Sequence, residues 1–216
     1  MTLPARRKVS APPEPGSLDP LVHEWGPEQP IIRCHDSRFG ATEFNRTRSE
    51  GRFRPVLVRG RIIGTLYGAE DDAGAVAEHV FRPVPVGAPI RRVRRARLVP
   101  VMISTLGCKR TLRLASLHGD GLRRVKSTRG ELIDSESDQY PALAQWGQAL
   151  HDCPSKPDGI VWRSRHYDDA YVLMLFGDRV RRADLKLLQP PVPLAVGRGL
   201  ERVMELAERA DITIVE

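Results

Sequence analysis

The chain has 216 residues, of which 41% are hydrophobic and 28% charged, the composition of a soluble globular protein. This length suits one ordinary domain with a hydrophobic core and leaves little room for a second. No apolar run approaches the roughly 20 residues that cross a bilayer, and the N-terminus lacks the apolar core of a signal peptide. These features argue against a membrane protein and a disordered chain, and we expect a cytoplasmic location.

The formal net charge of +7 is compatible with three kinds of partner, namely a nucleic acid, an anionic ligand or an acidic protein. Charge alone does not choose among them. The cysteines, Cys34, Cys108 and Cys153, are widely spaced and lack any CxxC or Cys/His ligand pattern. We therefore expect neither a disulfide bond nor a metal site.

Residues 1–30 contain seven prolines and few apolar residues, a composition typical of an extended arm. We expect the domain itself to span residues 31–216. It begins with the apolar pair Ile31–Ile32, which leads into a long polar loop through Arg54. Loops of that length in a compact domain often carry functional residues.

Residues 71–81 have the pattern of an amphipathic helix. Their apolar residues recur at i, i+3, i+4 and i+7, at Ala73, Val76, Ala77 and Val80. The helix should end before Pro83, because proline cannot continue the hydrogen-bond ladder. Glu78 lies beside the apolar stripe and not within it.

Other segments combine helix patterns with unevenly spaced strand patterns. A second helix is expected to begin at Pro141, and a third should include residues 200–207. Apolar runs typical of strands occur at 56–58, 62–63, 66–67, 98–103, 112–117, 159–162, 171–176 and 212–215. This mixture favours an α+β fold over a regular βαβ array.

Five blocks within residues 31–177 together resemble the RES domain family. They are IIRCHD (31–36), GRF (51–53), LYGAEDDAGAVAEHVF (66–81), YPALAQWGQALH (140–151) and GIVWRSRH (159–166) followed by VLMLF (172–176). The Arg, Glu and Ser that characterise the family fall on Arg33, Glu78 and Ser164, and a second family arginine falls on Arg52. The position after GRF, often Asn or Ser in the family, is Arg54 here.

The resemblance implies a fold similar to that of ADP-ribosyltransferase toxins, with a mixed sheet core and flanking helices. It also implies an enzyme that degrades NAD, either an NAD phosphorylase using inorganic phosphate or a glycohydrolase using water. NAD would be the substrate, and no cofactor is expected. The family further implies the toxin of a bacterial toxin–antitoxin pair, an Xre-type helix-turn-helix antitoxin as partner, and a homodimer. Transfer of ADP-ribose to a protein is the alternative activity.

Cleavage of the nicotinamide–ribose bond builds positive charge on the ribose while nicotinamide leaves neutral, so no general acid is required, unlike ordinary glycoside hydrolysis. One carboxylate near the ribose can suffice, and Glu78 is the candidate, with Arg33 as the second catalytic residue. The guanidinium groups of Arg33 and Arg52 suit the phosphates of NAD. Ser164 is expected to donate a hydrogen bond to a phosphate or to the nicotinamide amide, and Tyr67 to stack on a ring. Without the resemblance, all five would be interpreted as ordinary surface or core residues.

The arginine cluster RRVRRAR (91–97) lies outside the shared blocks. It predicts a solvated face or a surface that contacts a partner. A basic nucleic-acid-binding module is the competing hypothesis from another functional class. No helix-turn-helix or aromatic RNA-binding motif accompanies the cluster, so direct nucleic-acid binding is not expected.

Overall fold

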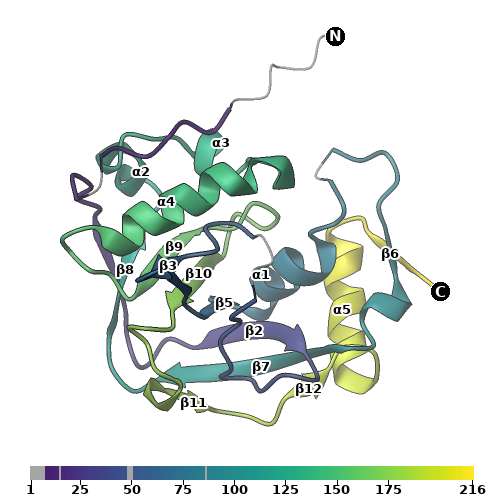
Figure 1. Cartoon of the computed structure of the whole chain (residues 1–216). Coiled ribbons are helices and arrows are strands. Elements are labelled where there is room, and N and C mark those ends of the chain that lie inside the picture. Colours follow the sequence, from purple (N-terminus) through teal and green to yellow (C-terminus); the bar gives the residue numbers. More distant parts are fainter. Residues whose placement is uncertain (1–7, 15, 48–50, 86) are drawn as a thin grey trace.

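A nine-stranded mixed sheet forms the centre of the computed structural model, which describes residues 8–14, 16–47, 51–85 and 87–216 (Figure 1). Its order is β1-β8-β9-β10-β5-β2-β7-β11, and β12 also pairs with β7. Neighbouring strands are antiparallel except β8 and β9, which are parallel. The strands are β1 (Val22–Trp25), β2 (Ile31–Asp36), β5 (Thr65–Ala69), β7 (Val101–Cys108), β8 (Leu112–Ser116), β9 (Gly159–Arg163), β10 (Tyr171–Phe176), β11 (Leu185–Leu187) and β12 (Val192–Pro193).

The sheet is nearly divided between β5 and β2. In the described part of the chain, these two strands are joined by the single pair of Ile32 and Ala69, whereas β2 follows β7 along its whole length. The close approach requires Gly68, because a Cβ there would lie 2.3 Å from Cγ2 of Ile31. Beyond this contact the strands separate, and the sheet forms two halves, β1-β8-β9-β10-β5 and β2-β7-β11.

Helix α4 (Tyr140–Asp152) covers the first half of the sheet (Figure 1). Pro141 lies in its first turn, as the sequence predicts. The side chains that it buries against β9 and β10 include Leu143, Trp146 and Leu150. Gly147 allows the helix to lie directly on the GRF segment, because a Cβ there would lie 2.1 Å from the carbonyl oxygen of Phe53. The helix thereby positions the loop that carries Arg52.

The segment predicted as one helix over residues 71–81 forms α1 (Asp72–Val76) followed by a π-helical turn, η1 (Ala77–Phe81). The side chain of Asp71 caps α1 by accepting a hydrogen bond from the Gly74 N–H at 2.7 Å. The apolar stripe is buried, as its spacing predicts. The same spacing does not predict the π-helical turn, a feature often found at functional sites.

Helix α5 (Gly197–Arg209) packs against α1 and η1, burying Val203 and Leu206 in a shared cluster with Val76 and Val80. After it, β13 (Thr213–Val215) pairs in parallel with β6 (Arg92–Arg94). The runs predicted at 56–58 and 62–63 form the antiparallel pair β3 (Leu57–Val58) and β4 (Arg61–Ile62). The remaining short helices are α2 (Asp120–Arg124), α3 (Arg129–Leu132), η2 (Arg95–Arg97), η3 (Ser137–Gln139) and η4 (Arg182–Asp184). A mixed sheet with flanking helices confirms the predicted α+β class. No helix of the described residues is long and apolar enough to cross a membrane.

The N-terminal segment differs from the arm predicted for residues 1–30, of which 1–7 and 15 lie outside the described residues. Residues Val22–Trp25 form β1, which pairs with β8 at the edge of the sheet. Upstream, Val9 and Leu18 are buried, and the Trp146 indole N–H donates to the Ser10 carbonyl at 2.8 Å. The segment is rich in proline, but a few of its apolar residues are buried in the core, so this part of it packs on the domain.

Candidate active site

Glu78 lies in η1 and is half-buried. Its Oε1 accepts two hydrogen bonds, from the Ser164 hydroxyl at 2.7 Å and from the Arg165 backbone N–H at 3.0 Å. Among the described residues, none donates a hydrogen bond to Oε2. Within the described residues, the protein therefore holds this carboxylate through one of its oxygens.

Ser164 follows β9 and is fully buried. Its hydroxyl oxygen accepts hydrogen bonds from the backbone N–H groups of His166, at 3.1 Å, and Tyr167, at 3.0 Å. A hydroxyl has one hydrogen to donate, and here that hydrogen goes to Glu78. The sequence prediction gave this hydrogen bond to the ligand, whereas the structure uses it to orient the carboxylate.

Arg52 is buried in the loop beneath α4. One terminal nitrogen donates to the Leu132 carbonyl at 2.7 Å and to the Ser135 hydroxyl at 3.2 Å, and the other donates to the Ser135 carbonyl at 3.1 Å. Burial lowers the pKa of Arg52, and Glu78 opposes this by raising it. Glu78 thus favours the charged form of Arg52 without a direct hydrogen bond to it in the described structure.

Tyr67 lies in β5, beside Arg52. Its hydroxyl donates to the carbonyl oxygen of Arg52, and its ring meets that of Trp162 edge-on at 6.4 Å between centroids. Burial raises the pKa of the Tyr67 phenol, so it stays protonated and keeps donating. The contact connects β5 to the GRF loop.

We call Glu78, Ser164, Arg52 and Tyr67 the charged cluster. Two more arginines belong to it, and the sequence analysis predicts neither. Arg165 donates to the Ser135 carbonyl at 3.1 Å and to the Glu136 carboxylate. Arg82 donates to the Tyr140 hydroxyl, and its guanidinium lies 5.3 Å from the centre of that ring. Arg165 directly follows Ser164 and Arg82 comes one helical turn after Glu78, a signal that could have identified them.

His166 shows how strongly basic this region is. Burial lowers the pKa of His166, and the charges of Arg165, Arg52 and Arg82 lower it further, while Glu78 opposes them. The three guanidinium groups and the Glu78 carboxylate thus all influence the charge of His166. Such a cluster suits a ligand that carries negative charge at one end and a polar hydroxyl near the carboxylate.

Arg33 has no hydrogen bond to the charged cluster in the described part of the chain. Burial lowers the pKa of His79, the residue after Glu78, to about 4, and charges that include those of Arg82 and Arg33 lower it further. The guanidinium of Arg33 donates to the carbonyl oxygens of Ala41 and Glu43, both at 2.7 Å, and so holds the loop after β2. Successive side chains of a strand alternate between faces, and the partner of Ala69 is Ile32. Arg33 therefore points to the face opposite that of Ile32 and Ala69. Burial lowers its pKa to about 10, which leaves it charged near neutral pH.

The arginine-rich segment 91–97 forms β6 and η2 at the edge of the molecule (Figure 1). Arg92 and Arg94 are exposed and Val93 between them is buried. Arg91 and Arg95 form ion pairs with Asp211, at 3.9 Å, and Glu216, at 3.2 Å, both of which are exposed. The segment is thus a solvated face, and contact with a partner stays a prediction.

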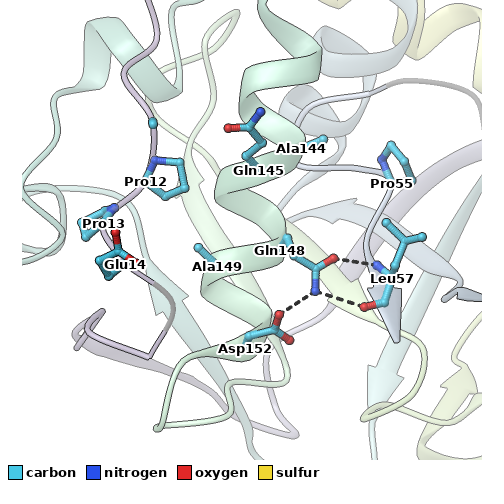
Figure 2. Close-up of a pocket in the computed structure, with 11 residues that line it drawn as sticks. Pro12, Pro13, Glu14, Pro55, Leu57, Ala144, Gln145, Gln148, Ala149 and Asp152 are labelled. Carbon is cyan, nitrogen blue, oxygen red and sulfur yellow. Dashed lines mark hydrogen bonds between the residues drawn. The ribbon is translucent and has the colours of Figure 1, made fainter. Parts of the chain in front are cut away.

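A separate cavity of about 450 Å³ lies between the N-terminal segment and α4 (Figure 2). Figure 2 shows Gln148 reaching across to β3, where its amide bonds the Leu57 N–H at 2.8 Å and the Leu57 carbonyl at 3.0 Å. Most other residues around the cavity are apolar, among them Pro12, Pro13, Pro55, Ala144 and Ala149. None of the predicted site residues lines it, so the cavity is distinct from the charged cluster.

Comparison with known proteins identifies the family. The model of the RES domain matches residues 30–196. The chain belongs to the RES domain family. Among solved structures, this RES domain is similar to a chain of the M. tuberculosis MbcT–MbcA toxin–antitoxin complex. The TM-score is 0.61 and the identity 18%, and the likeness covers 87% of this chain and 92% of that chain. At that identity the likeness shows a shared fold.

No curated protein matches the chain. The match to the family nevertheless spans Arg33, Arg52, Tyr67, Glu78 and Ser164, so all five predicted residues lie inside the RES domain. Hydrogen bonds or charge connect four of them to one another, and Arg33 bonds the loop after β2.

Proposed function

We propose that this RES domain cleaves the bond between nicotinamide and ribose in NAD, with Glu78 as the carboxylate beside the ribose. The observation that carries the proposal is the half-fixed carboxylate, with Oε1 held by Ser164 and the Arg165 N–H and Oε2 left without a donor among the described residues. A ribose hydroxyl would donate to Oε2. The guanidinium of Arg165 would face the phosphates, and the buried charge of Arg52 would act on them from behind the Ser135 carbonyl.

The bond that breaks joins C1′ of the ribose to the pyridinium nitrogen of nicotinamide. Its electron pair goes to that nitrogen, so nicotinamide leaves neutral and positive charge develops on the ribose. A fixed carboxylate favours that charge, and it does so most strongly where water is excluded. An oxygen of inorganic phosphate or of water then forms the new bond to C1′, and a water acceptor loses its proton to the solvent.

The surrounding charge matches this substrate. NAD carries two phosphates, and arginine can bind phosphate oxygens through two parallel hydrogen bonds while remaining charged at neutral pH. Glu78, Arg165, Arg52 and Arg82 all act on the pKa of His166, which supports this arrangement. A dinucleotide with its ribose at Glu78 would thus find cations for its pyrophosphate.

We further propose that the protein is the toxin of a toxin–antitoxin pair, neutralised by a partner protein. Membership of the RES domain family and the fold shared with a chain of the MbcT–MbcA toxin–antitoxin complex support this role. An Xre-type helix-turn-helix protein is the partner we expect, and a cytoplasmic location follows from the role. Expression of the chain alone should arrest bacterial growth, and co-expression with the product of the adjacent reading frame should restore it.

The decisive experiment measures nicotinamide released from NAD by the purified protein. We expect release in any buffer if water is the acceptor, and a rate that rises with inorganic phosphate if phosphate is. Chromatography would identify the product as ADP-ribose or as its 1″-phosphate. Absence of nicotinamide release with and without phosphate would refute the proposed activity.

A further inference from the structure

The segment of residues 132–136 lies against the arginines of the site. It supplies the carbonyl oxygens that Arg52 contacts, and Arg165 contacts it through the Ser135 carbonyl at 3.1 Å and the Glu136 carboxylate. Oxygen atoms of one short segment thus fill hydrogen-bonding positions that phosphate oxygens would otherwise occupy.

The two arginines are held in different ways. Both terminal nitrogens of Arg52 donate to backbone carbonyls, so freeing them requires the backbone to move. Arg165 is bound partly by the side chain of Glu136, which can rotate away by itself. The Glu136 side chain is 48% exposed and that of Arg165 is 17% exposed, so the carboxylate can return to water while the guanidinium stays in place.

Arg82 lies close to Arg52, because both guanidinium groups contact the ring of Tyr140. Its guanidinium is fixed on the Tyr140 ring, and a second guanidinium, that of Arg52, lies 5.9 Å from the centre of the same ring. Burial lowers the pKa of Arg52 most, and the charges of Arg165 and Arg82 lower it further. Without a bound anion, Glu136 is the acid that directly neutralises Arg165.

We propose that the guanidinium of Arg165 is a phosphate-binding subsite that Glu136 occupies in this structure, and that a phosphate group displaces the Glu136 carboxylate when it binds. The inference rests on the proposed function for the identity of the ligand. The phosphate group comes either from the pyrophosphate of the dinucleotide or from free inorganic phosphate, and the chemistry of recognition is the same for both. Glu136 then acts as an internal competitor that sets the affinity of the site.

The test compares Glu136→Gln with the unaltered protein by calorimetric titration of three probes, which are ADP-ribose, inorganic phosphate and adenosine. Glutamine keeps the shape of the side chain and removes the competing charge. We expect about fivefold tighter binding of at least one phosphate-bearing probe and no change for adenosine. Tighter binding of ADP-ribose would assign the subsite to the pyrophosphate of the dinucleotide. Tighter binding of inorganic phosphate would assign it to the free anion.

Two further variants make the result specific. Arg165→Gln should weaken binding of the same probe about tenfold, and adding Glu136→Gln to it should bring no recovery. Glu205→Gln is the matched control, because Glu205 forms an ion pair with Arg202 at 2.8 Å in α5 and its loss changes the net charge equally. It should leave all three affinities unchanged.

Three outcomes would each overturn the subsite. They are equally tighter probe binding in the Glu205 and Glu136 variants, tighter binding of adenosine, and unchanged binding of every probe. The titrations are independent of turnover. If nicotinamide is not released but Glu136→Gln tightens ADP-ribose, the subsite stands and the proposed NAD cleavage fails. If nicotinamide is released and no probe responds to Glu136→Gln, the proposed NAD cleavage stands and the subsite fails.

Discussion

Asp158 and Glu78 are both carboxylates held by hydrogen bonds inside the fold, but they are held differently. Asp158 uses both oxygens, since Oδ1 accepts from Arg110 at 2.7 Å, and Oδ2 accepts from Arg110 at 2.8 Å and from the Arg113 N–H at 2.9 Å. Glu78 uses Oε1 alone among the described residues.

The difference is consistent with a structural role for Asp158 and with the role proposed for Glu78 at the ribose. Asp158 gains its stabilisation entirely within the protein, because a bidentate arginine and a backbone N–H occupy its lone pairs. Glu78 is oriented by two donors and still presents an acceptor. Replacement of Asp158 should therefore lower the free energy of unfolding, and replacement of Glu78 should lower the rate of nicotinamide release.

Glu78→Gln is expected to give the largest effect. The amide keeps an oxygen that accepts from Ser164, so the fold should be retained, but it removes the negative charge that stabilises the ribose cation. Nicotinamide release should fall about 10²–10³-fold, with the melting temperature nearly unchanged. A variant with full activity would remove Glu78 from the proposed role, and a variant that unfolds would assign it to the structural class of Asp158.

Asp158→Asn should produce the opposite result. Asparagine cannot accept hydrogen bonds at both ends of its side chain, so its NH₂ group meets an Arg110 donor. We expect a loss of about 2 kcal/mol in the free energy of unfolding, measured by urea titration, with kcat retained. Asp120→Asn is the matched control, because its contact with Arg123 spans 4.0 Å at the surface, and its effect should be negligible.

The stability that Asp158 contributes should depend on pH. Burial would raise the pKa of Asp158, but the hydrogen bonds of Arg110 and the Arg113 N–H outweigh burial, and the pKa lies below its ordinary value of 3.8. Because the pKa of Asp158 is lower in the folded state, its ionised carboxylate contributes fully to the free energy of unfolding above pH 3.8. That contribution is lost as the pH falls below 3.8 and the carboxylate becomes protonated. The gap between the unaltered protein and Asp158→Asn should thus shrink towards pH 3. A gap that stays constant would contradict the charge-based account.

Much of the fold was accessible from the sequence, because hydrophobic spacing depends on local periodicity. The buried stripe of residues 71–81 and the start of α4 at Pro141 follow from it. The π-helical turn and β1 do not, since the first depends on the packing of Glu78 and its neighbours and the second on pairing with β8, a strand about 90 residues away in the sequence.

The site was accessible in part. Resemblance to a family selects residues, and Glu78 and Ser164 prove to be in contact although they are 86 positions apart. Resemblance does not show which group a hydrogen bond reaches, and this is why the hydroxyl of Ser164 was assigned to the ligand. It also does not show that Arg33 points to the opposite face, because this follows from the pairing of Ile32 with Ala69. The roles of these residues stay predictions.

Ser164→Ala distinguishes the two accounts of this hydroxyl and should give the smallest of the effects. If Ser164 only orients Glu78, its loss frees the carboxylate to rotate, and kcat should fall about tenfold with KM nearly unchanged. Ser164→Thr retains a hydroxyl and should recover part of the rate. Ser116→Ala is the control, since Ser116 is also a buried serine in the sheet but contacts the His118 carbonyl at 3.4 Å, and it should leave both constants unchanged. A rise in KM with kcat preserved would instead show that Ser164 binds the ligand, and Glu78 would then be oriented by the Arg165 N–H alone.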